Sequence, residues 1–263
     1  MSSLSRSEVA AALRAAGCVF AEEEAGLLLE AAADDELASL LARRVAGEPL
    51  EHVVGWAEFD GLRVAVAPGV FVPRRRSEAL VAVAAGLVGP GATVFDLCCG
   101  SGALGLAVAT RVPGVRLHAA DIDEDAVAVA RRNLGPAGGR VYLGDLFAAL
   151  PPALRGTFDL VVANVPYVPH DELRLMPREA RDFEPTAALD GGADGLDLLR
   201  RMADEAGAWL VPGGALVSEV NPAQVPEATA GLAGGGFVVR AVEPEDDDET
   251  VVLVGRFERP AGA

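Results

Sequence analysis

Three glycines within residues 93–105, TVFDLCCGSGALG, have the spacing of a cofactor-binding turn. Gly100, Gly102 and Gly105 form a G-x-G-x-x-G pattern between an apolar run and a helix-like segment. Glycine allows a sharp turn and a close approach to a ligand, and a helix start offers free N–H groups. Asp121 ends a second apolar run, where a carboxylate can accept hydrogen bonds from ribose hydroxyls. The pattern fits a nicotinamide enzyme and also a methyltransferase that uses S-adenosylmethionine (SAM).

Two further features favour SAM. Asp96 comes just before the glycine turn, where a carboxylate would repel a pyrophosphate but can accept hydrogen bonds from the cationic amino-acid end of SAM. The tetrapeptide Asn164-Val165-Pro166-Tyr167 follows another apolar run. An amide, a free carbonyl and an aromatic ring at the end of a strand suit a planar nitrogen substrate.

The tetrapeptide predicts the chemistry of transfer to such a nitrogen. An amide nitrogen is a poor nucleophile because its lone pair is delocalised, so the site must position it. Asn164 Oδ1 can accept one N–H and the carbonyl of Val165 the other, while Pro166 disfavours the helical conformation for Val165. Tyr167 can stack on the planar group. Transfer would then depend on positioning and electrostatics, with S-adenosylhomocysteine as the product.

Alternating elements must position these residues. From residue 93 onward we predict strands and helices in alternation, which indicates an α/β fold with a mostly parallel sheet. The final two strands are joined by the short acidic loop 243–249, which forces an antiparallel pair. The result is the seven-stranded Rossmann-like sheet of class I SAM-dependent methyltransferases. The predicted strands are 93–97, 115–120, 140–143, 158–163, 214–220, 236–241 and 250–257, and the predicted helices are 103–110, 124–133, 195–210 and 222–233.

In open α/β sheets the ligand lies beyond the carboxyl ends of the strands. We therefore predict a cofactor site from residues at four strand ends. Ile122 would form an apolar wall for adenine, and Asp145 would accept from the adenine amino group. Asp121 and Asp145 each have an alternative role as a helix N-cap. The predicted set is Asp96, Cys98, Gly100, Ser101, Gly102, Asp121, Ile122, Asp145, Leu146 and Asn164.

The residues before the sheet predict a helical lobe and a hairpin. Helices are expected from residue 4 to 46, the first capped by Ser5 or Ser7 and the third starting near residue 34. Strands 53–58 and 62–66, joined through Asp60-Gly61, predict a β-hairpin. An extended linker and a helix over 77–87 follow. We divide the chain into a helical lobe (1–48), a hairpin and linker (49–76) and a methyltransferase domain (77–263).

Composition narrows the class of protein. The chain has 263 residues, 51% of them apolar, and a net charge of −17, which disfavours binding to nucleic acid through a general positive field. The three cysteines, two of them adjacent, indicate no disulfide framework, and the scattered histidines indicate no metal site. The N-terminus lacks a signal-peptide core, and no apolar run could span a membrane. We expect a cytoplasmic protein.

With these motifs the chain resembles the protein-(glutamine-N5) methyltransferase family, which methylates the glutamine of a Gly-Gly-Gln loop in peptide chain release factors. The similarity covers roughly residues 47–257 and includes Val72-Pro73-Arg74 and the segment EPTAALDGGADGLD, residues 184–197. It implies a release factor, or another protein or peptide with a glutamine, as the partner. It also implies catalytic roles for the tetrapeptide, cofactor contacts from Phe71 and Pro73, and substrate contacts from Arg74, Asn164, Tyr167, Glu184 and Pro185.

Three departures from the family pattern indicate a paralogous branch. Val165 replaces the first proline of the usual Asn-Pro-Pro-Tyr, although the carbonyl is kept. Arg75-Arg76-Ser77-Glu78 replaces the usual Pro-Glu-Thr-Glu. The N-terminal lobe, which helps to dock the release factor in the family, is shorter than usual.

Other functions remain open at this point. The same tetrapeptide chemistry serves methylation of an adenine amino group in nucleic acid, and arginines 74–76 could form a local phosphate patch. Another small or peptide acceptor is a third alternative. An NAD-dependent dehydrogenase is disfavoured by Asp96 and by the lack of a catalytic His/Lys/Tyr set. A non-catalytic SAM-binding module is disfavoured by the presence of Asn164 and Tyr167.

Overall fold

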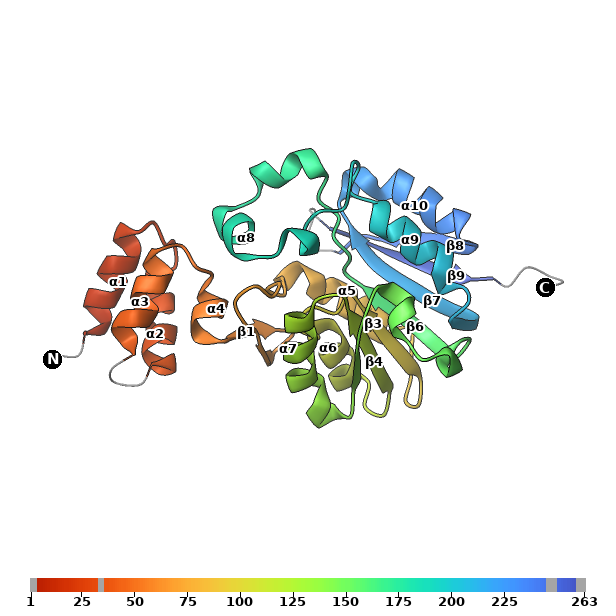
Figure 1. Cartoon of the computed structure of the whole chain (residues 1–263), viewed down its shortest axis with the longest axis horizontal. Coiled ribbons are helices and arrows are strands. Elements are labelled where there is room, and N and C mark those ends of the chain that lie inside the picture. The colour runs from red at the N-terminus through yellow and green to blue at the C-terminus, as the bar shows by residue number, and fades with distance from the viewer. Residues whose placement is uncertain (1–3, 33–35, 245–249, 259–263) are drawn as a thin grey trace.

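The chain begins with a small lobe of helices, and a domain in which strands and helices alternate follows it (Figure 1). The computed structural model describes residues 4–32, 36–244 and 250–258. Its α-helices are α1 (Arg6–Ala15), α2 (Ala21–Ala31), α3 (Leu37–Val45), α4 (Leu50–Val54), α5 (Glu78–Ala85), α6 (Ala103–Arg111), α7 (Glu124–Leu134), α8 (Arg178–Phe183), α9 (Asp197–Ala206) and α10 (Val225–Gly234). Its strands are β1 (Trp56–Phe59), β2 (Leu62–Ala65), β3 (Thr93–Leu97), β4 (Arg116–Asp121), β5 (Arg140–Leu143), β6 (Phe158–Ala163), β7 (Leu210–Val220), β8 (Phe237–Val242) and β9 (Val251–Phe257).

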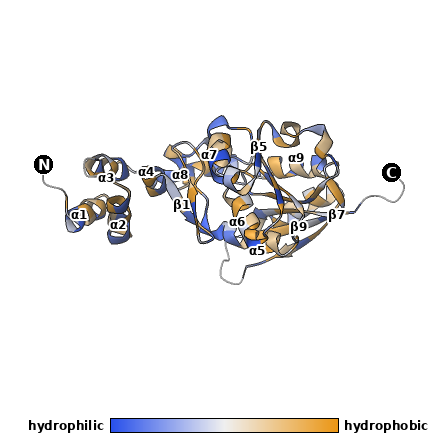
Figure 2. Ribbon diagram, turned by 90° about the horizontal axis from the view of Figure 1, so that it is seen from below, coloured by the Kyte–Doolittle hydropathy of each residue, from blue (hydrophilic) through white to orange (hydrophobic). Residues whose placement is uncertain are grey.

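Helices α1 to α3 form a small bundle at one end of the molecule (Figure 1). Ser5 caps α1 in a capping box with Glu8, which confirms one of the two predicted caps. Leu13 and Leu28 are fully buried in the core that these helices share. Figure 2 shows polar outer faces on the same helices. The predicted start of the third helix at residue 34 lies outside the described residues.

The prediction was wrong for the segment that follows this bundle. Residues expected to begin a strand at position 53 form helix α4 instead, and β1 begins only at Trp56. Pro49 is the N-cap residue, a position whose N–H has no partner within the helix, so proline costs no helical hydrogen bond there. Gly55 ends the helix in the left-handed conformation, with φ of 82°. The short helix turns Val53 into the core of the bundle.

The predicted hairpin is present as β1 and β2. Phe59 pairs with Leu62 across a turn in which Asp60 and Gly61 both have positive φ, the geometry of a tight two-residue turn. Asn133 of α7 fixes the hairpin to the main domain, because its side chain hydrogen-bonds both backbone groups of Ala65.

The main domain contains the predicted seven-stranded sheet, in the order β5-β4-β3-β6-β7-β9-β8. Strands β5, β4, β3, β6 and β7 are parallel to one another, whereas β9 is antiparallel to both β7 and β8. The mostly parallel sheet with a final antiparallel pair is therefore confirmed. The acidic loop predicted to join the last two strands lies largely in residues 245–249, outside the described residues.

Helices cover both faces of this sheet. One buried cluster joins α5, α6 and α7 to one face, and the other joins α9 and α10 to the opposite face. Apolar strands in the interior are coloured orange in Figure 2. Strand β3 is buried at all five positions, as a central strand with helices on both sides must be. The carboxyl ends of β3, β4 and β6 are thereby fixed side by side at one edge.

Helix α8, which the sequence did not predict, lies in a long excursion between β6 and α9 (Figure 1). Arg44 of α3, only 8% exposed, connects this excursion to the N-terminal bundle. Its guanidinium donates to Glu24 of α2 at 2.6 Å and to Glu179 of α8 at 2.7 Å. The buried pair with Glu24 lies within the bundle, and the half-exposed pair with Glu179 ties the bundle to the excursion.

We keep the predicted division at residues 48 and 76 as a proposal. The separate core of the first three helices supports it, although Val53 of α4 belongs to that core as well. No helix within the described residues is long and apolar enough to cross a membrane.

Candidate active site

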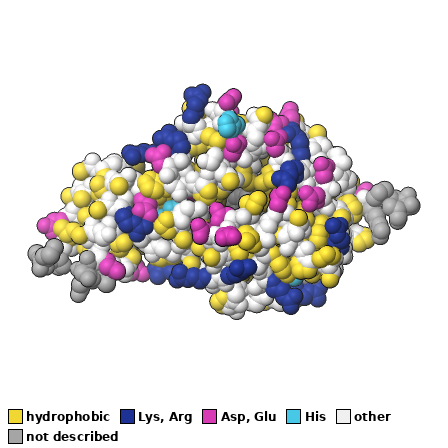
Figure 3. Space-filling view, in the orientation of Figure 1, with side chains coloured by type: hydrophobic (Ala, Val, Ile, Leu, Met, Phe, Trp, Pro, Cys, Tyr) yellow, Lys and Arg dark blue, Asp and Glu magenta, His cyan; other side chains and the backbone are white. Residues whose placement is uncertain are grey.

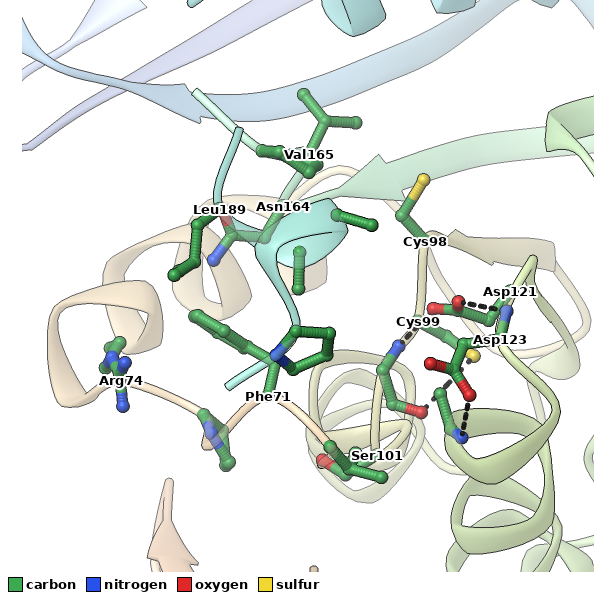
Figure 4. A pocket seen from close by; sticks show the side chains of 18 of the residues that line it. Phe71, Arg74, Cys98, Cys99, Ser101, Asp121, Asp123, Asn164, Val165 and Leu189 are labelled. Atoms are coloured by element: carbon green, nitrogen blue, oxygen red, sulfur yellow. Dashed lines mark hydrogen bonds between the residues drawn. The ribbon is translucent and has the colours of Figure 1, made fainter. Parts of the chain in front are cut away.

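A pocket lies at the carboxyl edge of β3, β4 and β6 and is closed on one side by the linker before α5 and by the excursion that contains α8. In Figure 4, Asn164, Leu189 and Phe71 lie toward one side of the pocket and Asp121 and Asp123 toward the other. Most of the predicted site residues line it: Phe71, Pro73, Arg74, Cys98, Gly100, Ser101, Asp121, Ile122, Asn164, Val165, Pro166, Tyr167 and Pro185.

The glycine turn has the backbone geometry that its sequence predicts. Gly100 and Gly102 have φ of 53° and 78°, a backbone conformation that residues with a side chain rarely adopt. A Cβ on Gly105 would lie 2.9 Å from Oδ2 of Asp96, so only glycine lets α6 start this close to β3. Nothing lies within 4 Å of a Cβ on Gly100, which leaves open space above the loop. The loop is therefore a cradle that a ligand can approach closely.

Asp96 differs from its predicted position. It is fully buried behind the loop and is not among the described residues that line the pocket. Its Oδ2 accepts a hydrogen bond of 2.8 Å from the Gly105 amide, while Oδ1 is buried without a partner. The side chain thus supports the loop from behind through the Gly105 amide, and its contact with SAM stays a prediction.

The burial of Asp96 predicts a pH dependence of stability. Burial raises the pKa of Asp96 to about 8, against an ordinary value of 3.8. Between these values the folded protein holds a proton that the unfolded chain has lost, so the free energy of unfolding falls as pH rises from about 4 to about 8. Asp96→Asn removes this contribution, and we expect its free energy of unfolding to vary less over that interval. Urea unfolding of both proteins at several pH values tests this, and equal slopes would contradict it.

Asp121 ends β4 and faces the pocket across the glycine loop. Its Oδ2 accepts from the Gly100 amide at 2.8 Å, and its Oδ1 accepts from the Asp123 amide at 3.0 Å. Burial raises the pKa of Asp121, while these two hydrogen bonds lower it. The helix N-cap of α7 is Asp123, so the alternative role predicted for Asp121 is not the one it has.

Replacement of Asp121 tests this end of the pocket. We expect Asp121→Ala to weaken SAM binding by about 1–3 kcal/mol, since a charged hydrogen-bonding group is lost from the pocket wall and from the glycine loop. Asp125→Ala is the matched control, because Asp125 is exposed in the first turn of α7 and carries the same charge. Calorimetry should show the loss only for Asp121→Ala; unchanged affinity, or tight binding of NAD, would contradict the assignment.

Asn164 follows β6 at the opposite end of the pocket. Its Nδ2 donates to Oγ of Ser77 at 3.1 Å. Among the described residues we find no donor to its Oδ1, the atom predicted to accept from the substrate. Ser77 belongs to the linker before α5 and is 2% exposed, so a buried side chain from a distant segment fixes the amide.

Tyr167 closes the same loop. Its hydroxyl donates to Oε1 of Glu219 at 3.3 Å, and burial followed by the charge of Glu219 raises its pKa to about 12. Its backbone carbonyl accepts from Nε2 of Gln224 at 2.9 Å. Both ends of the residue are therefore held by groups from β7 and the segment after it.

Glu184 holds Arg74, another of the predicted substrate-binding residues. Glu184 is 6% exposed, and its carboxylate accepts from the amide of Val72 at 3.2 Å and from the guanidinium of Arg74 at 2.6 Å. The guanidinium of Arg74 also lies over the ring of Phe71, 4.7 Å from its centre. Glu184 itself is not among the described lining residues, whereas Arg74 is. Glu184 therefore fixes the position of Arg74 and of the linker from outside the pocket.

Three other predicted cofactor residues lie outside the described lining. Asp145 pairs with Arg201 of α9 at 2.7 Å. Leu146 is 4% exposed in the core on the α9 side of the sheet. Gly102 packs against Leu134, which a Cβ would approach to 3.0 Å. The polar or apolar partners of these residues come from helices far along the chain, which the sequence pattern does not reveal.

The sequence also missed residues that line or support the pocket. Met176 and Leu189 line it from the long excursion, and Asp123 lines it after β4. Ser77 and Glu219 support Asn164 and Tyr167 from behind. The sequence signals that could have indicated Ser77 and Glu219 were a serine just before a helix and a glutamate within an apolar strand.

The surface around the pocket carries mixed charges. Acidic and arginine side chains are interspersed on the face shown in Figure 3. Cys98 and Cys99 are among the lining residues, their thiols are not in a disulfide, and burial raises the pKa of both thiols. They are therefore poor nucleophiles.

Comparison with known proteins places this geometry in a family. A family model described as the methyltransferase small domain matches residues 61–180. A release factor glutamine methyltransferase of Streptomyces coelicolor is 46% identical over 186 residues, which cover 68% of this chain and 65% of that protein, just under two thirds. Its counterpart from Geobacter sulfurreducens is 37% identical over 224 residues, 82% of this chain and 78% of that protein.

Two further matches extend the comparison. A 4-amino-L-phenylalanine/4-methylamino-L-phenylalanine methyltransferase of Streptomyces pristinaespiralis is 39% identical over 195 residues, 72% of this chain and 66% of that protein. A solved methyltransferase structure from Pyrococcus furiosus superposes with a TM-score of 0.58 at 17% identity, over 76% of this chain and 90% of that one. The match to the P. furiosus structure shows that this chain has the same fold.

The sheet order, the glycine loop and the family model together define a class I SAM-dependent methyltransferase. Within that class, the chain belongs to the release factor glutamine methyltransferase family.

Proposed function

We propose that the chain transfers the methyl group of SAM to the side-chain amide nitrogen of a glutamine in a peptide chain release factor. The observation that carries this proposal is the fixed amide of Asn164, whose donor end is held by Ser77 and whose oxygen is free of donors in the described protein. The names of the relatives from S. coelicolor and G. sulfurreducens support the choice of acceptor.

The residues present suit SAM. The open cradle over Gly100 and the carboxylate of Asp121 form one end of the pocket, and the unpartnered Oδ1 of Asp96 is a buried polar atom behind the loop. Ile122, 65% exposed in the pocket wall, offers an apolar surface for the adenine. SAM, when bound, supplies an electrophilic methyl group on a cationic sulfur.

At the other end of the pocket the protein orients the acceptor nitrogen. Asn164 Oδ1 accepts one N–H of the glutamine amide, and the carbonyl of Val165 accepts the second. The ring of Tyr167 packs on the planar amide. This arrangement removes the conformational freedom of the nitrogen and favours the position from which it attacks in line. The proton of the methylated nitrogen passes to water.

Incubation of the protein with methyl-labelled SAM and a purified release factor tests the proposal. We expect label on one glutamine, located by mass spectrometry of the digested release factor. A release factor with that glutamine replaced by alanine should stay unlabelled. 4-Amino-L-phenylalanine, the acceptor named for the S. pristinaespiralis relative, is the comparison acceptor. Faster methylation of this amine than of the release factor would overturn the proposed acceptor.

A further inference from the structure

Glu219 is a buried carboxylate behind the Asn164 loop. It lies on β7 and has no exposed surface. Side chains alternate along a strand, and the neighbours Ala215 and Val217 face the α5 side of the sheet. Glu219 therefore points toward the start of α5, where Ser77 lies. A carboxylate in such a place is costly to bury unless protein groups hydrogen-bond it.

Two segments supply such groups. Tyr167 donates its hydroxyl to Oε1 at 3.3 Å, while Oε2 is buried without a hydrogen-bond partner. Burial is the largest influence on the pKa of Glu219 and raises it overall, although hydrogen bonding by Ser77, the positive charge of Arg76, and hydrogen bonding by Tyr167 and Asn164 act against this rise. Residues 76–77 and 164–167, far apart in the sequence, thus meet around the carboxyl group of Glu219.

A buried oxygen without a donor favours the donor end of a neighbouring amide, and Oε2 of Glu219 is such an atom. A carboxyl group behind Asn164 therefore favours the orientation in which Nδ2 points inward, toward Ser77 and Glu219. The reversed amide would bring Oδ1 toward the carboxyl oxygens and present an NH₂ group to the pocket. The carboxyl group thereby favours the orientation that leaves Oδ1 to face the acceptor.

We infer that Glu219 is a positioning residue that fixes the amide orientation of Asn164 for methyl transfer. The inference rests on the proposed function only in the assumption that Asn164 contacts the acceptor. Glu219 itself lies behind the pocket wall and contacts neither end of it.

Glu219→Gln is the test variant, because it keeps the size of the side chain and replaces one acceptor oxygen with a donor. Ser218→Ala is the matched control. Ser218 is the preceding residue on β7, is equally buried, and its hydroxyl has no partner. Both variants therefore change a buried polar side chain of β7. Only Glu219→Gln is expected to change the loop that contains Asn164.

The first measurement needs no acceptor. The chain has only three asparagines, Asn133, Asn164 and Asn221, so asparagine labelled with ¹⁵N in the side chain gives three NH₂ signals. The Asn164 signal is identified by its loss in Asn164→Ala. In Glu219→Gln we expect this signal to shift and its protons to exchange about 10-fold faster. The Asn133 signal and all signals of Ser218→Ala should stay unchanged. An unchanged Asn164 signal, or equal disturbance of all three, would overturn the inference.

The second measurement is kinetic. Glu219→Gln should lower kcat by about 10²-fold and leave the SAM dissociation constant unchanged, because misplacing a positioning group affects transfer and not cofactor binding. In an Asn164→Ala background the same change should alter kcat by less than about 2-fold, since its effect passes through Asn164. Additive losses would contradict the inference. If only 4-amino-L-phenylalanine is methylated, the proposed acceptor fails, and the same cycle measured with that amine still decides the role of Glu219.

Discussion

Asn164→Ala is expected to lower turnover by about 10²-fold or more while SAM affinity stays nearly unchanged. In the proposed function the amide oxygen of Asn164 orients the acceptor nitrogen, whereas the end of the pocket proposed for the cofactor is formed by residues after β3 and β4. Single-turnover kinetics and calorimetry measure the two effects separately.

Two variants sharpen this expectation. Asn164→Asp keeps an acceptor oxygen and should retain some activity, although its charge also lies close to Glu219. Val165→Pro restores the proline pair usual in the family and should be tolerated, because only the backbone carbonyl of residue 165 is used. Turnover of Asn164→Ala at the wild-type rate would remove the basis for a planar nitrogen acceptor, and oxygen or carbon methylation would then be favoured.

Gly195→Ala is expected to destabilise the protein by about 3 kcal/mol or more and to reduce turnover with it. Gly195 has φ of +79°, and a Cβ there would overlap the carbonyl oxygen of Tyr167 and the side-chain amide of Gln224. These two groups form the 2.9 Å hydrogen bond that holds the Tyr167 loop. The added methyl group must therefore displace the loop that carries Asn164 and Tyr167.

Gly213→Ala separates this steric effect from backbone strain. Gly213 has the same φ of +79°, but nothing lies within 4 Å of its Cβ position. It should lose only about 1–2 kcal/mol, the cost of a left-handed conformation for a residue with a side chain. Urea unfolding gives the stabilities, and activity below the unfolding transition gives turnover. Equal losses in the two variants would show that Tyr167 and Gln224 move aside at little cost.

Much of the fold was predictable because its signals are local. Apolar runs with flanking glycines located all seven strands of the sheet to within a few residues. The loop between the last two strands was too short for a crossover helix, which fixed the antiparallel pair. The prediction failed at α4 and α8, since a single turn or two of helix has almost no periodic pattern and is stabilised by the tertiary contacts of residues such as Val53 and Arg44.

The candidate site shows the same division. The backbone conformations of Gly100 and Gly102, and the presence of Asn164 and Asp121 at strand ends, follow from short stretches of sequence and the rule that parallel strands end at one edge. The exact direction of each side chain does not. Asp96 faces the start of α6, and Asp145 turns to Arg201, although both stand at the strand ends that the sequence indicated.

The amino-acid sequence by itself thus determined the class of sheet, the glycine turn and the presence of the tetrapeptide 164–167 at a strand end. Only the tertiary structure decided which buried groups hold that tetrapeptide. Ser77, Asn164 and Glu219 meet because β6 and β7 are neighbours in the sheet and α5 packs on the same face. Such meetings depend on strand order and on burial, which act between segments more than fifty residues apart and leave no periodic trace in any one of them.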